Sequence, residues 1–105
     1  MDKIAMLNQI LAQNPQDAFA RYGLAMAYAS NGDFTTAVSE FDQLLKDHPT
    51  YTAGYFMAAQ TLVKAGQPKT AQSMLREGIK SARREGNQHA EAEMQQLLDE
   101  LDSQV

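Results

Sequence analysis

Few side chains in this 105-residue sequence are placed where they could carry out chemistry. His89 and Glu93 are four residues apart, so on a helix they would share one face and could both reach a single metal ion. Two ligands do not complete a site, and the sequence has no cysteine to supply a thiolate. Because isolated surface histidines are common, we interpret the pair as structural and expect no metal site.

One segment, Gly66-Gln67-Pro68-Lys69-Thr70, has a superficial likeness to a phosphate-binding loop. Such a loop needs a glycine directly before the lysine and a row of backbone N–H donors, and Pro68 has no N–H. No serine, histidine and acidic residue are spaced in a way that suggests a nucleophile with its base. We therefore predict that the protein is not an enzyme and has neither catalytic residues nor a cofactor.

Four basic residues gather in one stretch of the chain, at Arg76, Lys80, Arg83 and Arg84. No aromatic residues are interleaved with them, and the chain has a net charge of −4 and a pI near 5.0. Both facts argue against a nucleic-acid-binding surface. Basic residues near a helix C-terminus interact favourably with the helix dipole, and these can also pair with Glu91 or Glu93.

The length and composition favour one domain in a reducing compartment. A chain of this size can bury roughly two-thirds of the surface that its unfolded form exposes, so a core is possible without disulfides. The apolar run at residues 4–7 is too short for a signal peptide, and no segment could span a membrane. We expect a cytoplasmic protein that does not associate with membranes.

Proline and glycine divide the sequence into helical segments. The segments between the breaks are rich in Ala, Leu, Met, Gln and Glu, which favour helices, and none alternates with a period of two. The chain is therefore predicted to be all-α, with about six helices. The breaks lie at Asn14-Pro15, Asn31-Gly32-Asp33, His48-Pro49, Gly66-Gln67-Pro68 and Glu85-Gly86-Asn87.

The most prominent residues of the sequence occur twice, 34 residues apart. A fixed period of this size is typical of stacked helix-turn-helix repeats, each of which needs a neighbour to bury its apolar face. Small residues recur where two helices must approach closely. The recurring pairs are Pro15 and Pro49, Tyr22 and Phe56, Ala25 and Ala59, Gly32 and Gly66, and Ala37 and Ala71.

The pattern resembles that of the tetratricopeptide repeat family, in which Trp, Leu-Gly, Tyr, Ala, Phe and Pro follow at fixed spacings. The first copy has Leu24-Ala25, Tyr28, Ala37, Phe41 and Pro49 at these positions, with Arg21 in place of Trp. The second copy has Tyr55, Ala58-Ala59, Leu62, Ala71 and Leu75. Arg83 stands where its proline should fall, which predicts that this helix continues to about residue 84.

The resemblance implies an α-solenoid of antiparallel helix pairs, of the kind found in small bacterial proteins of this family. We expect one domain over residues 1–105. Its parts would be a half-repeat helix at 1–14, repeats at 16–49 and 50–84, and a C-terminal capping helix at 87–103. The capping helix is expected from a stripe of apolar residues opposite an acidic side.

In this family the first helices of the repeats line a concave groove that holds a peptide or partner helix. The predicted groove residues are Phe19, Tyr22, Met26, Ser30, Phe56, Gln60, Val63 and Lys64. Other members hold acidic chaperone C-termini with Lys and Asn, but Tyr22 and Met26 occupy those places, so we reject such a carboxylate clamp. With one cation in an apolar groove, binding should depend weakly on salt.

The resemblance therefore predicts a non-enzymatic module that binds a protein or peptide of unknown identity. Two alternatives remain open at this point. In one, the groove or the open N-terminal end is occupied by a second copy in a homodimer. In the other, the groove aromatics pack on each other or against the C-terminal helix.

Overall fold

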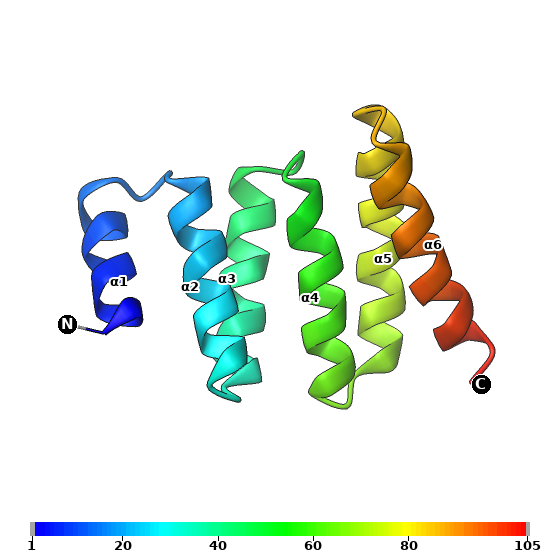
Figure 1. Cartoon of the computed structure of the whole chain (residues 1–105), viewed down its shortest axis with the longest axis horizontal. Coiled ribbons are helices and arrows are strands. Elements are labelled where there is room, and N and C mark those ends of the chain that lie inside the picture. Colours follow the sequence, from blue (N-terminus) through cyan, green and yellow to red (C-terminus); the bar gives the residue numbers. More distant parts are fainter. Residues whose placement is uncertain (1, 105) are drawn as a thin grey trace.

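The computed structural model describes residues 2–104, which form six α-helices and no strand (Figure 1). This confirms the predicted all-α fold. The helices are α1 (Lys3–Gln13), α2 (Ala18–Ser30), α3 (Phe34–Asp47), α4 (Thr52–Lys64), α5 (Pro68–Arg84) and α6 (Gln88–Asp102). Helix starts follow the expected chemistry, since the Asp33 carboxylate accepts a hydrogen bond from the Thr36 N–H and Pro68 opens α5.

Three of the connections are the same tight turn around a glycine with positive φ. Gly32, Gly66 and Gly86 have φ angles of 80°, 78° and 68°, a region that side chains with a Cβ rarely adopt. In each turn the N–H after the glycine reaches back to a helix carbonyl, as from Asn87 to Ala82 at 2.8 Å. The third turn follows α5, which ends at Arg84 as predicted because no proline stops it.

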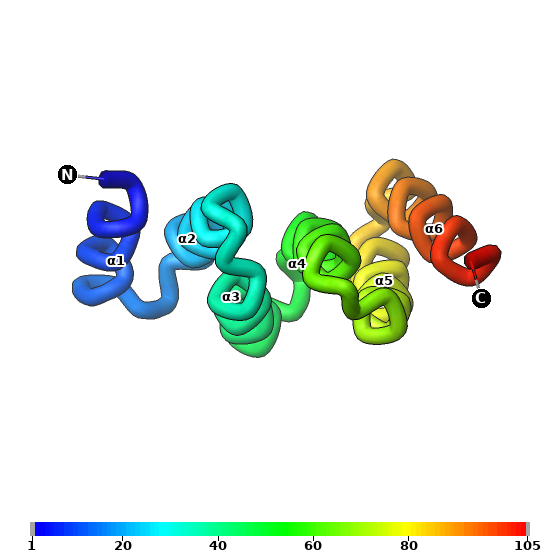
Figure 2. Tube along the Cα trace, turned by 90° about the horizontal axis from the view of Figure 1, so that it is seen from below, coloured from blue at the N-terminus to red at the C-terminus, as the bar shows by residue number. Residues whose placement is uncertain are grey.

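The helices stack into an elongated array of 43 × 30 × 18 Å. Seen from below, α2, α4 and α6 lie in one layer and α3 and α5 in another, with α4 set slightly back between α2 and α6 (Figure 2). The first layer is therefore concave on its outer side, and it contains the helices predicted to line a groove.

Small residues allow the two layers to approach closely. Ala25, Ala37 and Ala58 are fully buried in one cluster with Phe41, and Ala59 and Ala71 are fully buried in the next. The close alanine contacts predicted from the 34-residue period are thus present, and each is flanked by a large side chain that fills the remaining space.

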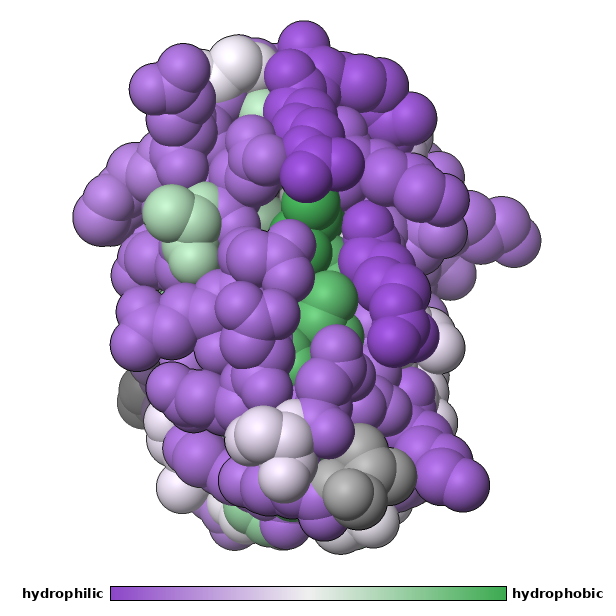
Figure 3. Space-filling model, turned by 90° about the vertical axis from the view of Figure 1, so that its right-hand side faces the viewer, coloured by the Kyte–Doolittle hydropathy of each residue, from purple (hydrophilic) through white to green (hydrophobic). Residues whose placement is uncertain are grey.

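The two ends of the array differ. The C-terminal end presents hydrophilic side chains over most of its area, broken by one narrow hydrophobic strip (Figure 3). At the N-terminal end, α1 buries Leu11 against α2 but leaves Met6 50% and Ile10 43% exposed. Among the described residues α1 packs against α2 alone, which leaves this face uncovered.

Candidate partner-binding groove

Two adjoining hollows lie on the concave layer. The upper one, about 320 Å³, is bounded by Tyr22 of α2, by the first turns of α4 and by the start of α6. The lower one, about 230 Å³, lies between α4 and α6. Phe56 and Glu93 line both, so the hollows form one groove with an aromatic ring at its centre and a carboxylate on its wall.

Tyr22 contributes to the groove and to the core at once. Its ring centroid lies 5.4 Å from that of Tyr51 and 6.3 Å from that of Phe41, which it meets edge-on. Burial raises the pKa of the Tyr22 phenol, and the neighbouring Tyr51 raises it further. Phe56 is also half-buried and packs against the core cluster of α4, α5 and α6. The structure therefore brings Tyr22 and Phe56 to one hollow, with part of each ring used in packing.

Only Tyr22, Phe56 and Gln60 of the predicted groove residues line the two hollows. Met26 is half-buried against the core, and Ser30 lines a separate hollow beside Asp2 and Lys3 of α1.

The remaining three predicted residues, Phe19, Val63 and Lys64, are exposed and line neither hollow. Phe19, at 78%, is the most exposed of the large apolar side chains described in residues 2–104.

The sequence prediction did not assign the wall of the groove, which belongs to α6. Glu93, Gln96 and Glu100 of α6 line the lower hollow together with Leu97, and His89 and Ala90 line the upper one. Of the alternatives left open by the sequence, packing of a groove aromatic against the C-terminal helix holds for Phe56, which packs against the cluster that contains Met94 and Leu98 of α6. The spacing of Glu93, Gln96 and Glu100 places them on one helical face, and this signal could have identified the wall.

Ion pairs occupy several of the charged side chains of α5 and α6. Arg83 Nε lies 2.6 Å from Glu91 Oε2, which confirms one of the two pairings predicted for the basic stretch. Arg76 lies 3.8 Å from Asp102, and His89 Nε2 lies 3.1 Å from Glu93 Oε1. Within residues 2–104, no group of three side chains is placed to hold a metal ion, and no helix is long and apolar enough to cross a membrane.

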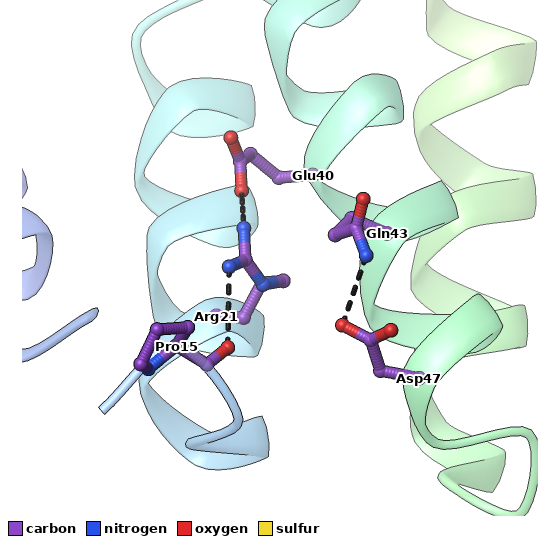
Figure 4. Close-up of polar contacts among 5 residues, drawn as sticks. All are labelled: Pro15, Arg21, Glu40, Gln43 and Asp47. Atoms are coloured by element: carbon purple, nitrogen blue, oxygen red, sulfur yellow. Dashed lines mark hydrogen bonds and ion pairs between the residues drawn. The ribbon is translucent and has the colours of Figure 1, made fainter. Parts of the chain in front are cut away.

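Arg21, which stands where the family pattern has Trp, joins α2 to α3 and to the turn before α2 (Figure 4). Its Nη1 lies 2.6 Å from Glu40 Oε1 of α3, and its Nη2 donates to the Pro15 carbonyl at 3.3 Å. This cation is thus committed to an ion pair and is absent from the lining of either hollow.

Comparison with known proteins agrees with this architecture. The TPR repeat-containing protein PA0015 of Pseudomonas aeruginosa is 29% identical over 96 residues, with 91% of each chain covered. A tetratricopeptide repeat domain protein of Salinibacter ruber superposes with a TM-score of 0.80 at 26% identity, covering 86% of this chain and 91% of that one.

A third protein shares the fold. The TPR2B domain of yeast Sti1, in a complex with pHsp70, superposes with a TM-score of 0.89 at 18% identity, covering 97% of this chain and 82% of that one. The family pattern of the tetratricopeptide repeat matches this sequence over residues 4–47 and 28–101. Because these two matches together span nearly all of the sequence, the chain belongs to the tetratricopeptide repeat family.

Proposed function

We propose that this protein is a non-enzymatic module that holds a peptide or helix of another protein in the groove between α2, α4 and α6. The observation that carries the proposal is the pair of adjoining hollows that share Phe56 and Glu93. Binding sites are commonly concave and largely apolar, with a few polar groups that fix orientation. The yeast domain with the same fold is known in a complex with pHsp70, which supports a peptide-sized ligand.

The groove can be blocked without removing a core contact. Ala53 is exposed and lines the upper hollow, so Ala53→Gln adds bulk to the groove and leaves the half-buried aromatics in place. Ala12→Gln makes the same change on the exposed surface of α1 and serves as the control.

The test is a selection of displayed random peptides against the wild-type protein, followed by affinity measurements on the enriched sequences. We expect Ala53→Gln to weaken their binding at least tenfold and Ala12→Gln to leave it unchanged, with both variants melting like wild type. Enriched peptides that bind both variants equally would contradict a ligand site in this groove.

A second candidate function is self-association through the N-terminal end. The partly exposed Met6 and Ile10 on the free face of α1 favour it, because uncovered apolar side chains drive association.

A cytoplasmic location stays a prediction.

A further inference from the structure

We infer that the partner segment is cationic and amphipathic, with apolar side chains in the two hollows and Lys or Arg side chains beside Glu93 and Glu100. This inference rests on the proposed function and adds the chemical class of the partner. It follows from the placement of α6, whose acidic residues Glu93 and Glu100 line the groove.

Apart from the imidazole of His89, the ionisable side chains that line the two hollows near α6 are carboxylates. Glu93 lines both hollows, Glu100 lines the lower one, and Glu85 lines a shallow depression next to the upper one, beside Ala53 and Asn87. Neither hollow is lined by a lysine or an arginine. A ligand with basic side chains is therefore attracted along the whole wall, whereas an acidic ligand meets repulsion.

Each nearby cation is either committed elsewhere or placed outside the hollows. Arg83 pairs with Glu91 and Arg21 pairs with Glu40. Lys64 and Arg84 are exposed at the ends of α4 and α5, and neither lines a hollow. His89 contacts Glu93, but its side chain is 87% exposed and can turn away when a stronger cation arrives. The carboxylates on the wall are therefore accessible to a ligand.

The apolar residues of the groove favour a ligand that has apolar side chains as well as basic ones. Phe56 lines both hollows, with Met57 and Ala90 beside it in the upper one and Leu97 in the lower one, so apolar side chains of a ligand can contact its ring from either hollow. Amphipathic helices bind grooves in this way, with apolar anchors on one side of the helix and polar residues on the other. A basic segment without apolar anchors would leave both hollows unfilled.

A second copy of this chain is a poor match to the same groove. The face that each copy could offer is the exposed side of α1, where Met6 and Ile10 are uncovered. Helix α1 contains a single basic residue, Lys3, and its N-cap Asp2 is acidic. That face cannot pair with a row of carboxylates, so we commit to a partner of a different sequence.

The test uses two designed amphipathic peptides with the same leucine-rich apolar side. The polar positions are lysine in one and glutamate in the other, and both carry a fluorescent label for anisotropy titration. We expect the lysine peptide to bind at least tenfold more tightly, with an affinity that falls as salt is raised, because salt screens exposed charge pairs. This revises the weak salt dependence expected from the sequence.

Variants then locate the effect on the wall. Glu93→Gln with Glu100→Gln should weaken the lysine peptide by about two- to fivefold for each carboxylate, as for exposed ion pairs. The control, Asp42→Asn with Glu77→Gln, removes the same net charge from α3 and α5, outside both hollows, and should change the affinity little. Equal losses in the two double variants would overturn the inference by showing attraction to overall charge.

The blocking variant separates this inference from the proposed function. If both peptides bind wild type equally and both lose affinity in Ala53→Gln, the groove binds ligands but does not select cations, and the inference is wrong. If the lysine peptide binds Ala53→Gln and wild type equally, the groove is not its site, and the proposed function fails with the inference.

Discussion

In each of the two repeats, a different side chain makes the same hydrogen bond to the turn before the first helix. Arg21 and Tyr55 occupy the same repeat position, 34 residues apart, as do Pro15 and Pro49. Arg21 donates to the Pro15 carbonyl at 3.3 Å, and the Tyr55 hydroxyl donates to the Pro49 carbonyl at 2.8 Å. At this repeat position both side chains therefore donate a hydrogen bond to the proline carbonyl of the preceding turn. This shared role explains how Arg21 and Tyr55 can each replace the family's Trp.

The Tyr55 hydrogen bond can be tested by removing one oxygen atom. Tyr55→Phe should destabilise the fold by about 0.5–1.5 kcal/mol, since the ring stays buried and one hydrogen bond is lost. Tyr22→Phe is the control, because that hydroxyl has no hydrogen bond to any residue in 2–104. Urea unfolding of the two variants measures the difference. Equal midpoints would show that the Tyr55 bond adds no stability.

Alkaline pH should weaken the fold through the same two phenols. Burial raises the pKa of Tyr22 and Tyr55 above the ordinary value of 10.0, although Arg84 partly opposes the shift at Tyr55. The folded state therefore holds these protons more tightly than the unfolded state. The stabilisation is complete below pH 10 and is lost as pH rises through the folded-state pKa values.

The measurement is urea unfolding of wild type and of Tyr22→Phe with Tyr55→Phe, at neutral pH and above pH 10. Stability should fall more steeply in wild type than in the double variant. An identical fall in both proteins would show that other groups cause the alkaline effect.

At the scale of elements, the close contact of α5 with α4 and α6 depends on a glycine, Gly78, which has no side chain. A Cβ added at Gly78 of α5 would lie 2.5 Å from the Met94 sulfur of α6 and 2.6 Å from the Tyr55 Cβ of α4. The Tyr55 Cβ is fixed by its backbone and cannot move aside. Gly78 therefore sets how closely α5 packs against the groove-lining helices on both sides.

Gly78→Ala should destabilise the protein in spite of the better helix propensity of alanine. Overpacking costs about 1–3 kcal/mol, against a gain of roughly 1 kcal/mol in propensity. Gly23→Ala on α2 is the matched control. Its added Cβ would meet only Leu7 at 3.5 Å, so the propensity gain should raise the melting temperature. Thermal melts of both variants test this, and a stabilised Gly78→Ala would contradict the close approach.

The sequence predicted the elements better than the site. Most helix ends are marked locally by a proline, a glycine or a capping side chain, so the bounds of α3 and α5 could be read from the residues around them. The groove depends on the rotation of α6 about its own axis. The 34-residue period stops at α6, where Glu93 falls at the place of Ala25 and Ala59, so the period could not place its face.

Exposure was the other property that the period could not predict. Helical spacing within each copy assigns Met26 to the same face as Tyr22, and Val63 to the same face as Phe56. In the structure Met26 packs against the core and Val63 lies outside both hollows. Which residues of a face line a hollow depends on the neighbouring helices, and for α4 that neighbour is α6.

For the molecule as a whole, the two ends of the array differ in how much apolar surface they expose, and this difference bears on association with other chains. Each interior helix pair is covered on both sides, and the outer side of α6 is largely hydrophilic (Figure 3). Among the described residues, Met6 and Ile10 lie exposed together on α1 at the N-terminal end, whereas Phe19 and Val63 are exposed on α2 and α4. In a stacked array an uncovered face is where another unit can add, whether that unit is a second copy or part of another chain.

We predict that this face makes the protein associate with itself as its concentration rises. Met6→Gln with Ile10→Gln should abolish the association, because it replaces the exposed apolar atoms and keeps good helix formers and the same net charge. Ala12→Gln, on the same helix, should associate like wild type. Sedimentation velocity over a range of concentrations measures the outcome. A wild-type protein that remains monomeric at high micromolar concentration would show that two exposed side chains are too small a patch, and the dimer alternative would be wrong. Loss of association in the double variant with unchanged peptide binding would show that the N-terminal face and the groove act independently.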